Sequence, residues 1–360
     1  MKIALAAPAI YPARGGVELH VHGLARSLAA LGHEVHVFTG AGPVGESSGF
    51  GYRVSRGVGL TALPSALCHQ GFDVVHAHGA RTLFAAGALV AGKAGGLHTV
   101  FTPHCFYPAQ DWSGRIKRAL FDPSLGRLAL RCSDHVICLT ANDQNDALAC
   151  GAARESIQLI PNSISLPELP AEVQVAEFRR RRNWGKFLLS VGRLDRVKGG
   201  DFLIAALPHL PPDLHLVFVG PDRGCLGLWR RQAEDMGLAA RVHFLLDAPD
   251  AELHLAYQAS LALVMASAYE GLPTVLLEAM ALRTPVIAAA TGGIGWLLQN
   301  GVNGLLYPFG DLRGFCAQVR LCLEGAPEEM LDQAWECVRQ GYSWNVNAPR
   351  IAALYNGHVS

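Results

Sequence analysis

The sequence predicts two tandem α/β domains, each built on a doubly wound parallel sheet. Short runs of β-branched residues alternate with longer runs at helical spacing, which is the pattern of repeated βαβ units. A chain of 360 residues is too long for one ordinary hydrophobic core. With 50% hydrophobic and 17% charged residues, it is also too apolar to be disordered. The alternation breaks at residues 161–174, where three prolines stand among polar residues, so the domain boundary is expected there.

Each half of the chain supplies its own set of strands and helices. In the first half, strands are expected at residues 2–8, 33–39, 73–79, 98–104 and 134–140, with helices at 18–32 and 80–95. The first run has the length of a buried strand and Pro8 interrupts it, which favours a strand over a signal peptide. In the second half, strands are expected at 186–194, 214–220, 241–246, 261–267, 285–290 and 304–309, with helices at 199–210 and 225–238.

Composition excludes several classes of function. Thirty basic residues balance thirty acidic ones, so the protein has no net positive charge that would attract it to nucleic acid. The nine cysteines fit neither a zinc knuckle nor a thioredoxin-like motif, and buried thiols in a reducing cytosol are expected. No uncharged apolar run reaches the ~18 residues of a membrane span. These features predict a cytoplasmic protein without a nucleic-acid partner.

The residues that follow the predicted strands carry the chemistry. In open α/β sheets the ligand lies outside the carboxyl ends of the strands. Glycines and side chains with imidazole, cationic or carboxylate groups follow the carboxyl ends of the predicted strands, namely Gly15, Gly16, His104, Arg193, Lys198 and Glu270. Arg193 and Lys198 could grip a diphosphate through a guanidinium and an ammonium group, although two solvated surface cations would give the same pattern.

Two glutamates stand in the otherwise apolar stretch 267–293. Glu270 is expected in the loop before a helix, with Pro273 in the first turn and Glu278 in the second turn. That path separates the carboxylates by roughly 10 Å, which suits two parts of one extended ligand. The amides around Gly271, Leu272 and Thr274 would hold an anion at the helix start.

The chain resembles the family 4 glycosyltransferases of the GT-B fold over essentially its full length. The resemblance rests on GGVELHVHGLARSLAALGHEVHVFT, VGRLDRVKGG, SAYEGLPTVLLEAMALRTPVIAAATGG, NGVNGLLYPFGD and YSWNVNAPRIAALY, in that order. It implies two Rossmann-like domains facing a central cleft, an acceptor-side domain at 1–163 and a nucleotide-sugar-binding domain at 164–344. The C-terminal helix at 345–360 is then expected to pack back on the first domain.

The resemblance also implies an activity and roles for individual residues. The activity is transfer of a sugar from a nucleotide-diphosphate sugar, with retention of anomeric configuration, to a hydroxyl of a glycan or lipid-linked acceptor in bacterial envelope or polysaccharide assembly. Glu270 is then expected to contact the donor sugar, Glu278 the ribose, and Arg193 and Lys198 the diphosphate. By the same resemblance, Gly16 lets the N-terminal loop approach the diphosphate and His104 reaches the sugar.

No metal or other cofactor is expected. The chain contains no Asp-x-Asp, the motif with which the other large glycosyltransferase fold holds a divalent metal. His76 and His78 alternate along a strand end, so only one is expected to face the cleft, and solvated or backbone-bonded side chains are favoured over metal ligands. Charge on the leaving diphosphate would then be met by Arg193, Lys198 and helix dipoles.

Two positions depart from the family pattern. Leu246 stands where members commonly have glycine after a strand, and Trp296 stands where many have glutamate. Both changes spare the phosphate and sugar contacts, but they leave the donor's identity open.

Three other functions compete with this interpretation. The run GAGPVG at 40–45 matches a dinucleotide-binding fingerprint of an oxidoreductase, but Pro43 lies inside it and no helical pattern follows. A GT-B-related nucleotide-sugar epimerase would share the diphosphate site and need no acceptor. A catalytically silent binding module is disfavoured, because the basic pair and both glutamates are present.

The segment 112–131 combines basic and apolar side chains and could lie on an anionic membrane. Its apolar residues are interleaved with five basic ones, namely Arg115, Lys117, Arg118, Arg127 and Arg131. An ordinary packed helix pair is slightly favoured, because Pro123 and Gly126 break the helix. The membrane alternative places the protein peripherally at the inner face of the cytoplasmic membrane.

Overall fold

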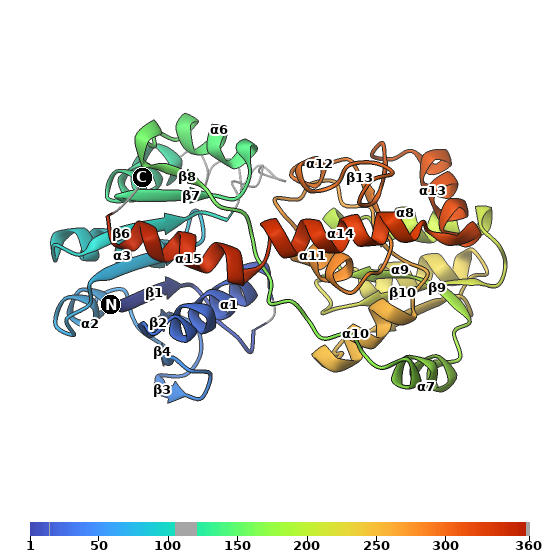
Figure 1. Cartoon of the computed structure of the whole chain (residues 1–360), viewed down its shortest axis with the longest axis horizontal. Helices are drawn as coiled ribbons and strands as arrows, with labels where there is room; N and C mark the ends of the chain where they lie inside the picture. The colour runs from blue at the N-terminus through green and yellow to red at the C-terminus, as the bar shows by residue number, and fades with distance from the viewer. Residues whose placement is uncertain (14, 105–120, 358–360) are drawn as a thin grey trace. The chain divides into compact units, whose positions relative to one another are not determined.

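The computed structural model describes residues 1–13, 15–104 and 121–357. The chain divides into two compact units (Figure 1). The first unit contains residues 1–165 and 341–360, and the second contains residues 166–340. Each unit carries its own sheet.

Within the described residues, the sheet of the first unit has eight strands in the order β3-β4-β2-β1-β5-β6-β7-β8. Neighbouring strands pair in parallel except β3 and β4, which are antiparallel. The strands are β1 Lys2–Ala7, β2 Glu34–Thr39, β3 Gly45–Ser48, β4 Arg53–Arg56, β5 Val74–His78, β6 His98–Thr102, β7 His135–Cys138 and β8 Ile157–Leu159. The chain order reverses between β1 and β5, which makes their carboxyl ends the switch point of this sheet.

Helices cover both faces of this sheet (Figure 1). Alternate residues of a strand point to opposite faces, so each buried strand contributes to two cores. Ile3 and Leu5 of β1 share a core with helices α1 Gly16–Ala30 and α15 Trp344–Tyr355. Ala4 and Ala6 share the opposite core with α2 Leu63–Cys68, α3 Leu83–Ala94, α5 Arg127–Arg131 and α6 Ala141–Ala149. The C-terminal helix therefore packs on α1 within the first unit.

The second unit has a fully parallel sheet of six strands in the order β11-β10-β9-β12-β13-β14. The strands are β9 Lys186–Val191, β10 Leu214–Val219, β11 Val242–Leu245, β12 Ala262–Met265, β13 Val286–Ala289 and β14 Leu305–Tyr307. The helices are α7 Glu172–Arg182, α8 Gly200–Ala206, α9 Leu226–Asp235, α10 Asp250–Ala259, α11 Thr274–Ala281, α12 Ile294–Leu297, α13 Leu312–Gly325 and α14 Glu328–Gly341. Its switch point lies between β9 and β12.

The predicted fold class, two doubly wound parallel α/β sheets, is confirmed. The run 40–45 is followed by the hairpin strands β3 and β4 and not by a helix, so it lacks the structure of a dinucleotide-binding turn. Within the described parts of the chain, no helix combines the length and apolarity needed to cross a bilayer.

Candidate active site

The two strands at the switch point of the second unit are followed by the predicted cationic and acidic residues. Arg193 and Lys198 come after β9, and Glu270 comes after β12. Because β9 and β12 are parallel neighbours, their carboxyl ends lie at the same edge of the sheet. The topology therefore gathers these side chains from segments more than 70 residues apart in the sequence.

Lys198 and Glu270 form an ion pair at this edge. Lys198 Nζ lies 2.6 Å from Glu270 Oε1, and the two side chains are 20% and 7% exposed. A carboxylate so deeply buried needs a partner, since an isolated buried charge costs several kcal/mol. The ammonium group keeps two further N–H donors, which could face an anionic ligand.

Glycine allows the two loops to approach this closely on the β9 side. Gly199 follows Lys198 with φ of +66°, a left-handed conformation, and a Cβ there would lie 2.4 Å from the Ala266 carbonyl oxygen. The backbone N–H of Ala268 donates to the Val197 carbonyl at 2.8 Å. The loop that carries Lys198 is thus fixed against the loop that carries Glu270.

A second glycine holds the other side of the Glu270 loop. Gly292, after β13, has φ of +53°, and a Cβ there would lie 2.0 Å from the Glu270 carbonyl oxygen. The N–H of Gly293 donates to that same oxygen at 2.9 Å, and Thr291 Oγ1 donates to the Ser267 carbonyl at 2.9 Å. Glu270 is therefore positioned by the loops that follow three adjacent strands.

Arg193 lies at the same sheet edge but in a more solvated position. Its side chain is 52% exposed, and the guanidinium nitrogen Nη2 lies 3.5 Å from Asp195 Oδ2. Such a weakly held cation is free to turn toward a phosphate group, since a guanidinium can bind phosphate oxygens bidentately.

Glu278 occupies the second turn of α11 and has a protein partner. Tyr257 Oη donates to Glu278 Oε2 at 2.9 Å. Burial raises the pKa of Glu278, and the Tyr257 hydrogen bond offsets part of that shift. The structure thus joins Glu278 to Tyr257, and joins Glu270 to Lys198.

The predicted amide groups stand at the start of the same helix. Gly271 and Leu272 are buried and Thr274 is partly buried, and Thr274 is the first residue of α11. The expectation that Pro273 stands in the first turn is off by one position, because Pro273 is the N-cap. Proline suits that place because it has no N–H to leave unpaired.

The remaining predicted residues, Gly15, Gly16 and His104, belong to the first unit. Gly15 is the extended N-cap of α1, with φ of −158°, and Gly16 is its first residue. Among the described residues, and apart from its chain neighbours and the backbone of α1, no heavy atom lies within 4 Å of the position that a Cβ on Gly16 would take. The start of α1 is therefore open to a ligand at this point.

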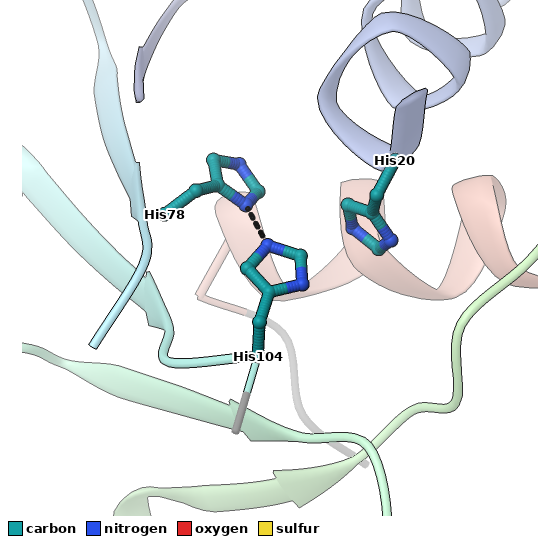
Figure 2. A group of neighbouring side chains, drawn as sticks. All are labelled: His20, His78 and His104. Atoms are coloured by element: carbon teal, nitrogen blue, oxygen red, sulfur yellow. Dashed lines mark hydrogen bonds between the residues drawn. The ribbon is translucent and has the colours of Figure 1, made fainter. Parts of the chain in front are cut away.

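His104 follows β6 and belongs to a cluster of three histidines (Figure 2). Potential ligand atoms of His20, His78 and His104 lie within 4.8 Å of one another, so these side chains could approach one metal ion. However, His78 Nδ1 and His104 Nε2 already share a hydrogen bond of 3.1 Å. A metal ion would have to displace the proton between them, so a hydrogen-bonded pair describes the arrangement better.

The expectation that His76 and His78 are solvated or backbone-bonded is wrong. Both side chains are fully buried, and their partners are other side chains. His76 Nδ1 lies 2.7 Å from Tyr355 Oη, and its Nε2 lies 2.7 Å from Thr102 Oγ1. The missed partners are side chains of β6 and α15, which no local pattern in the sequence connects to β5.

Burial keeps these histidines neutral, and this has a consequence for stability. Burial lowers the pKa of His20 to about 4, an effect that Asn162 offsets in part, and holds the pKa values of His76, His78 and His104 well below 6.5. The unfolded chain binds protons below pH 6.5 that the folded chain does not bind. Folding stability is therefore fully present above pH 6.5 and is lost as the pH falls toward 4.

The expected result is that unfolding becomes easier in mild acid. Between pH 7.5 and 5.5, each such histidine should lower the free energy of unfolding by about 1.4 kcal/mol. Thermal denaturation at both pH values would measure this loss, and His20→Asn should reduce it. An equal loss in the wild type and in His20→Asn would contradict the assignment for His20.

Residues 112–120 of the basic and apolar segment 112–131 lie outside the described residues. The described part begins at Phe121 and consists of a π-helical stretch at Asp122–Gly126 followed by α5. Asp122 forms an ion pair with Arg81, whose Nε lies 2.7 Å from Asp122 Oδ1.

Two family models match the chain, one for each part. The model described as Glycosyltransferase Family 4 matches residues 14–167, and the model described as Glycosyl transferases group 1 matches residues 176–336. The second match includes both glutamates and both cations of the switch point.

Individual relatives and solved structures agree with these matches. A D-inositol 3-phosphate glycosyltransferase from Frankia alni is 30% identical over 81% of this chain and 82% of that protein. The GPI3 subunit of phosphatidylinositol N-acetylglucosaminyltransferase from Saccharomyces cerevisiae is 24% identical over 83% of this chain and 70% of that protein.

Among solved structures, Anabaena HepE in complex with UDP-glucose superposes with a TM-score of 0.81 at 21% identity, covering 99% of this chain and 100% of HepE. The lipopolysaccharide outer core galactosyltransferase WaaB matches with a TM-score of 0.71 at 17% identity, covering 99% of this chain and 100% of WaaB. At these identities the likeness shows the fold. From the family models, the identity to the Frankia protein and the GT-B architecture, the chain belongs to the family 4 glycosyltransferases, retaining enzymes that use nucleotide-sugar donors.

Proposed function

We propose that the second unit binds the nucleotide-sugar donor at the switch point, and that Lys198 and Glu270 bind different groups of this donor. Lys198 and Arg193 bind the diphosphate, Glu270 binds hydroxyls of the donor sugar, and the amides of Gly271, Leu272 and Thr274 add dipolar stabilisation. The observation that carries this proposal is the buried ion pair of Lys198 and Glu270, held by glycines on both sides. The ion pair supports the proposal because it would offer a cation to the phosphate and a hydrogen-bond acceptor to the sugar hydroxyls.

Stabilisation of the leaving group supplies the main catalytic effect. When the bond between the sugar and the diphosphate breaks, negative charge grows on the departing phosphate. A preorganised cation beside it stabilises that charge without reorganisation, an effect typically worth 10²-fold or more in rate. Lys198 is held by the Glu270 carboxylate before the donor arrives, so its ammonium group is already in place.

Retention follows from a front-face path in this proposal. Retaining glycosidases use two carboxylates about 5 Å apart, one of them a nucleophile. Glu270 and Glu278 are separated by roughly 10 Å along a helical path. The Glu278 carboxylate already accepts a hydrogen bond from the Tyr257 hydroxyl. We therefore assign Glu278 to the nucleotide ribose, and the departing phosphate helps to deprotonate the acceptor hydroxyl.

The first unit supplies the acceptor side and one contact to the sugar. His104 binds the donor sugar, and Gly15 and Gly16 let the start of α1 approach the diphosphate. The open space at Gly16 supports this role, because any side chain there would fill it.

The acceptor we propose is a hydroxyl of a glycan or lipid-linked molecule in bacterial envelope or polysaccharide assembly. The names of the relatives widen the set to test, since they include an inositol phosphate and a phosphatidylinositol as substrates. An epimerase would convert the donor alone. Consumption of donor only when an acceptor is present would distinguish the transferase from the epimerase.

A donor screen tests the proposal directly. Purified protein is heated with UDP-, GDP- and ADP-sugars, and the cognate donor should raise the melting temperature. A concentration of 100 times Kd should stabilise the protein by about 2.7 kcal/mol. UDP-glucose is the first donor to test, because HepE was solved with it. Absence of stabilisation by every donor at millimolar concentration would contradict the proposed site.

Turnover should not require a metal ion. The cations of Arg193 and Lys198 and the start of α11 meet the phosphate charge, so a bridging Mg²⁺ is not needed. Rates in excess EDTA are expected to equal rates with magnesium. A rate that collapses on chelation and recovers when the metal is restored would overturn the assignment.

Peripheral contact with the inner face of the cytoplasmic membrane through 112–131 is a separate proposal. Each basic residue near an anionic surface contributes about 1 kcal/mol. The protein should co-sediment with anionic but not neutral vesicles, and less so as salt rises. Equal sedimentation with both vesicle types, or with neither, would leave an enzyme whose acceptor must come to it.

A further inference from the structure

His104 stands on strained backbone that the neighbouring strand holds in place. It has φ of +69°, a left-handed value that few residues other than glycine adopt. Beyond the ends of the strands, the Gly79 N–H donates to the Thr102 carbonyl at 3.0 Å and the Ala80 N–H donates to the Pro103 carbonyl at 2.8 Å. The pairing of β5 with β6 thus continues past both strands and brings His78 beside His104.

The two rings share one hydrogen bond. His78 Nδ1 and His104 Nε2 are 3.1 Å apart (Figure 2). Burial keeps both rings neutral at pH 7, so each carries one proton and only one proton lies between them. Either His78 donates to His104, or His104 donates to His78.

The far nitrogen of His78 decides between these arrangements. Among the described residues, His78 Nε2 is buried without a hydrogen-bond partner. If His104 donated, His78 would carry its own proton on Nε2, a buried N–H with no acceptor. Orphaned buried N–H groups are rarer than under-satisfied acceptors. His78 therefore keeps its proton on Nδ1 and donates to His104.

Neighbouring rings hold His78 and His104 in this orientation. The centroids of the His76 and His78 rings are 4.1 Å apart. Both nitrogens of His76 are hydrogen-bonded, one to Tyr355 and the other to Thr102. The His20 ring meets the His104 ring edge-on at 4.6 Å. His76 is therefore structural, while His78 has one nitrogen committed to His104.

We propose that His78 is a positioning residue that fixes the tautomer of His104. Its Nδ1–H donates to His104 Nε2, so His104 carries its proton on Nδ1 and offers an N–H donor to an oxygen of the donor sugar. The sugar contact rests on the function proposed above, whereas the tautomer is a property of the free protein. The ligand recognised is thus a hydroxyl or ring oxygen accepting a hydrogen bond from a neutral imidazole.

The tautomer can be read without any substrate. Long-range ¹H–¹⁵N spectra of the full chain with ¹⁵N-labelled histidine, assigned with His78→Asn and His104→Gln, should show a protonated Nδ1 and a bare Nε2 on both rings at pH 7.5. A protonated Nε2 on His104 would overturn the proposal.

Two nearly isosteric variants test the consequence for turnover. Asparagine at position 78 can place an N–H donor where Nδ1 stands, whereas aspartate can only accept and would draw the proton of His104 onto Nε2. His78→Asp is expected to lower kcat about 10-fold or more, as loss of a hydrogen bond that orients a working side chain typically does, and His78→Asn should stay within about 3-fold of the wild type. Equal losses in both variants would contradict a positioning role.

The controls separate the two proposals. His69→Ala, at an exposed histidine of the first unit, should leave kcat unchanged. The predicted tautomer together with unaffected rates in both position-78 variants would uphold the hydrogen bond and reject the sugar contact of His104. A protonated Nε2 on His104, together with a turnover rate that still falls in Lys198→Ala, would reject only the inference about His78.

Discussion

Lys198→Ala is expected to lower kcat/KM by about 10²-fold or more. The substitution removes the cation that faces the departing diphosphate, and loss of one electrostatic stabiliser has this magnitude. It also leaves the Glu270 carboxylate without the partner 2.6 Å away, so the sugar contact should suffer as well. Steady-state kinetics with the cognate donor would measure the effect.

The controls distinguish a site effect from a general loss of charge. Lys186→Ala removes an exposed lysine at the opposite end of β9 and should leave kcat/KM unchanged. Arg193→Ala is also expected to reduce turnover by about 10²-fold, since its guanidinium would bind the same diphosphate. Rates near the wild type for both Arg193→Ala and Lys198→Ala would remove this pair from the donor site.

Gly292→Ala is expected to lower turnover by a similar factor without changing any charge. A Cβ at this position would lie 2.0 Å from the Glu270 carbonyl oxygen, so the backbone of the Glu270 loop must move by about 1 Å or more. A displacement of that size at a reacting centre can cost 10²-fold in rate. Kinetics together with a thermal melt would separate the loss of activity from the loss of stability.

Gly301→Ala is the matched control for this substitution. Gly301 also has a left-handed φ, of +76°, but in the described parts of the chain no heavy atom beyond its two chain neighbours lies within 4 Å of its Cβ position. Alanine there carries only the conformational cost, on the order of 1–2 kcal/mol, and should lower the melting temperature without lowering kcat. If the two variants lost activity equally, the contact between Gly292 and the Glu270 loop would not explain the loss.

The sequence was sufficient for the fold because buried parallel strands are apolar and regularly spaced. The strands that it missed lack this signal. β3 is exposed at every residue, β4 has four residues that include two arginines, and β8 has only three residues, so none of the three shows an apolar run of strand length. Their positions depend on the strands that they pair with and not on their own pattern, since β4 pairs with β2, β3 with β4, and β8 with β7.

The candidate site was predictable where residues follow strands and unpredictable where contacts cross the chain. Glu270 and Lys198 could be singled out by position, but their ion pair joins segments 72 residues apart. Tyr257 reads as an ordinary core residue of α10, and only the structure shows its hydroxyl on Glu278. Gly199 stands at the start of the helix expected at 199–210, but its close approach to Ala266 could not be predicted from the sequence.

The most direct test of the central claim is the affinity of the protein for a nucleoside diphosphate and for the matching nucleoside, measured by titration calorimetry in the wild type and in Lys198→Ala. The nucleotide is the one that the donor screen selects. If Lys198 holds the diphosphate, Lys198→Ala should weaken binding of the diphosphate by about 10-fold or more, equivalent to about 1.4 kcal/mol, and should not change binding of the nucleoside. Equal affinity of both proteins for the diphosphate would contradict the account.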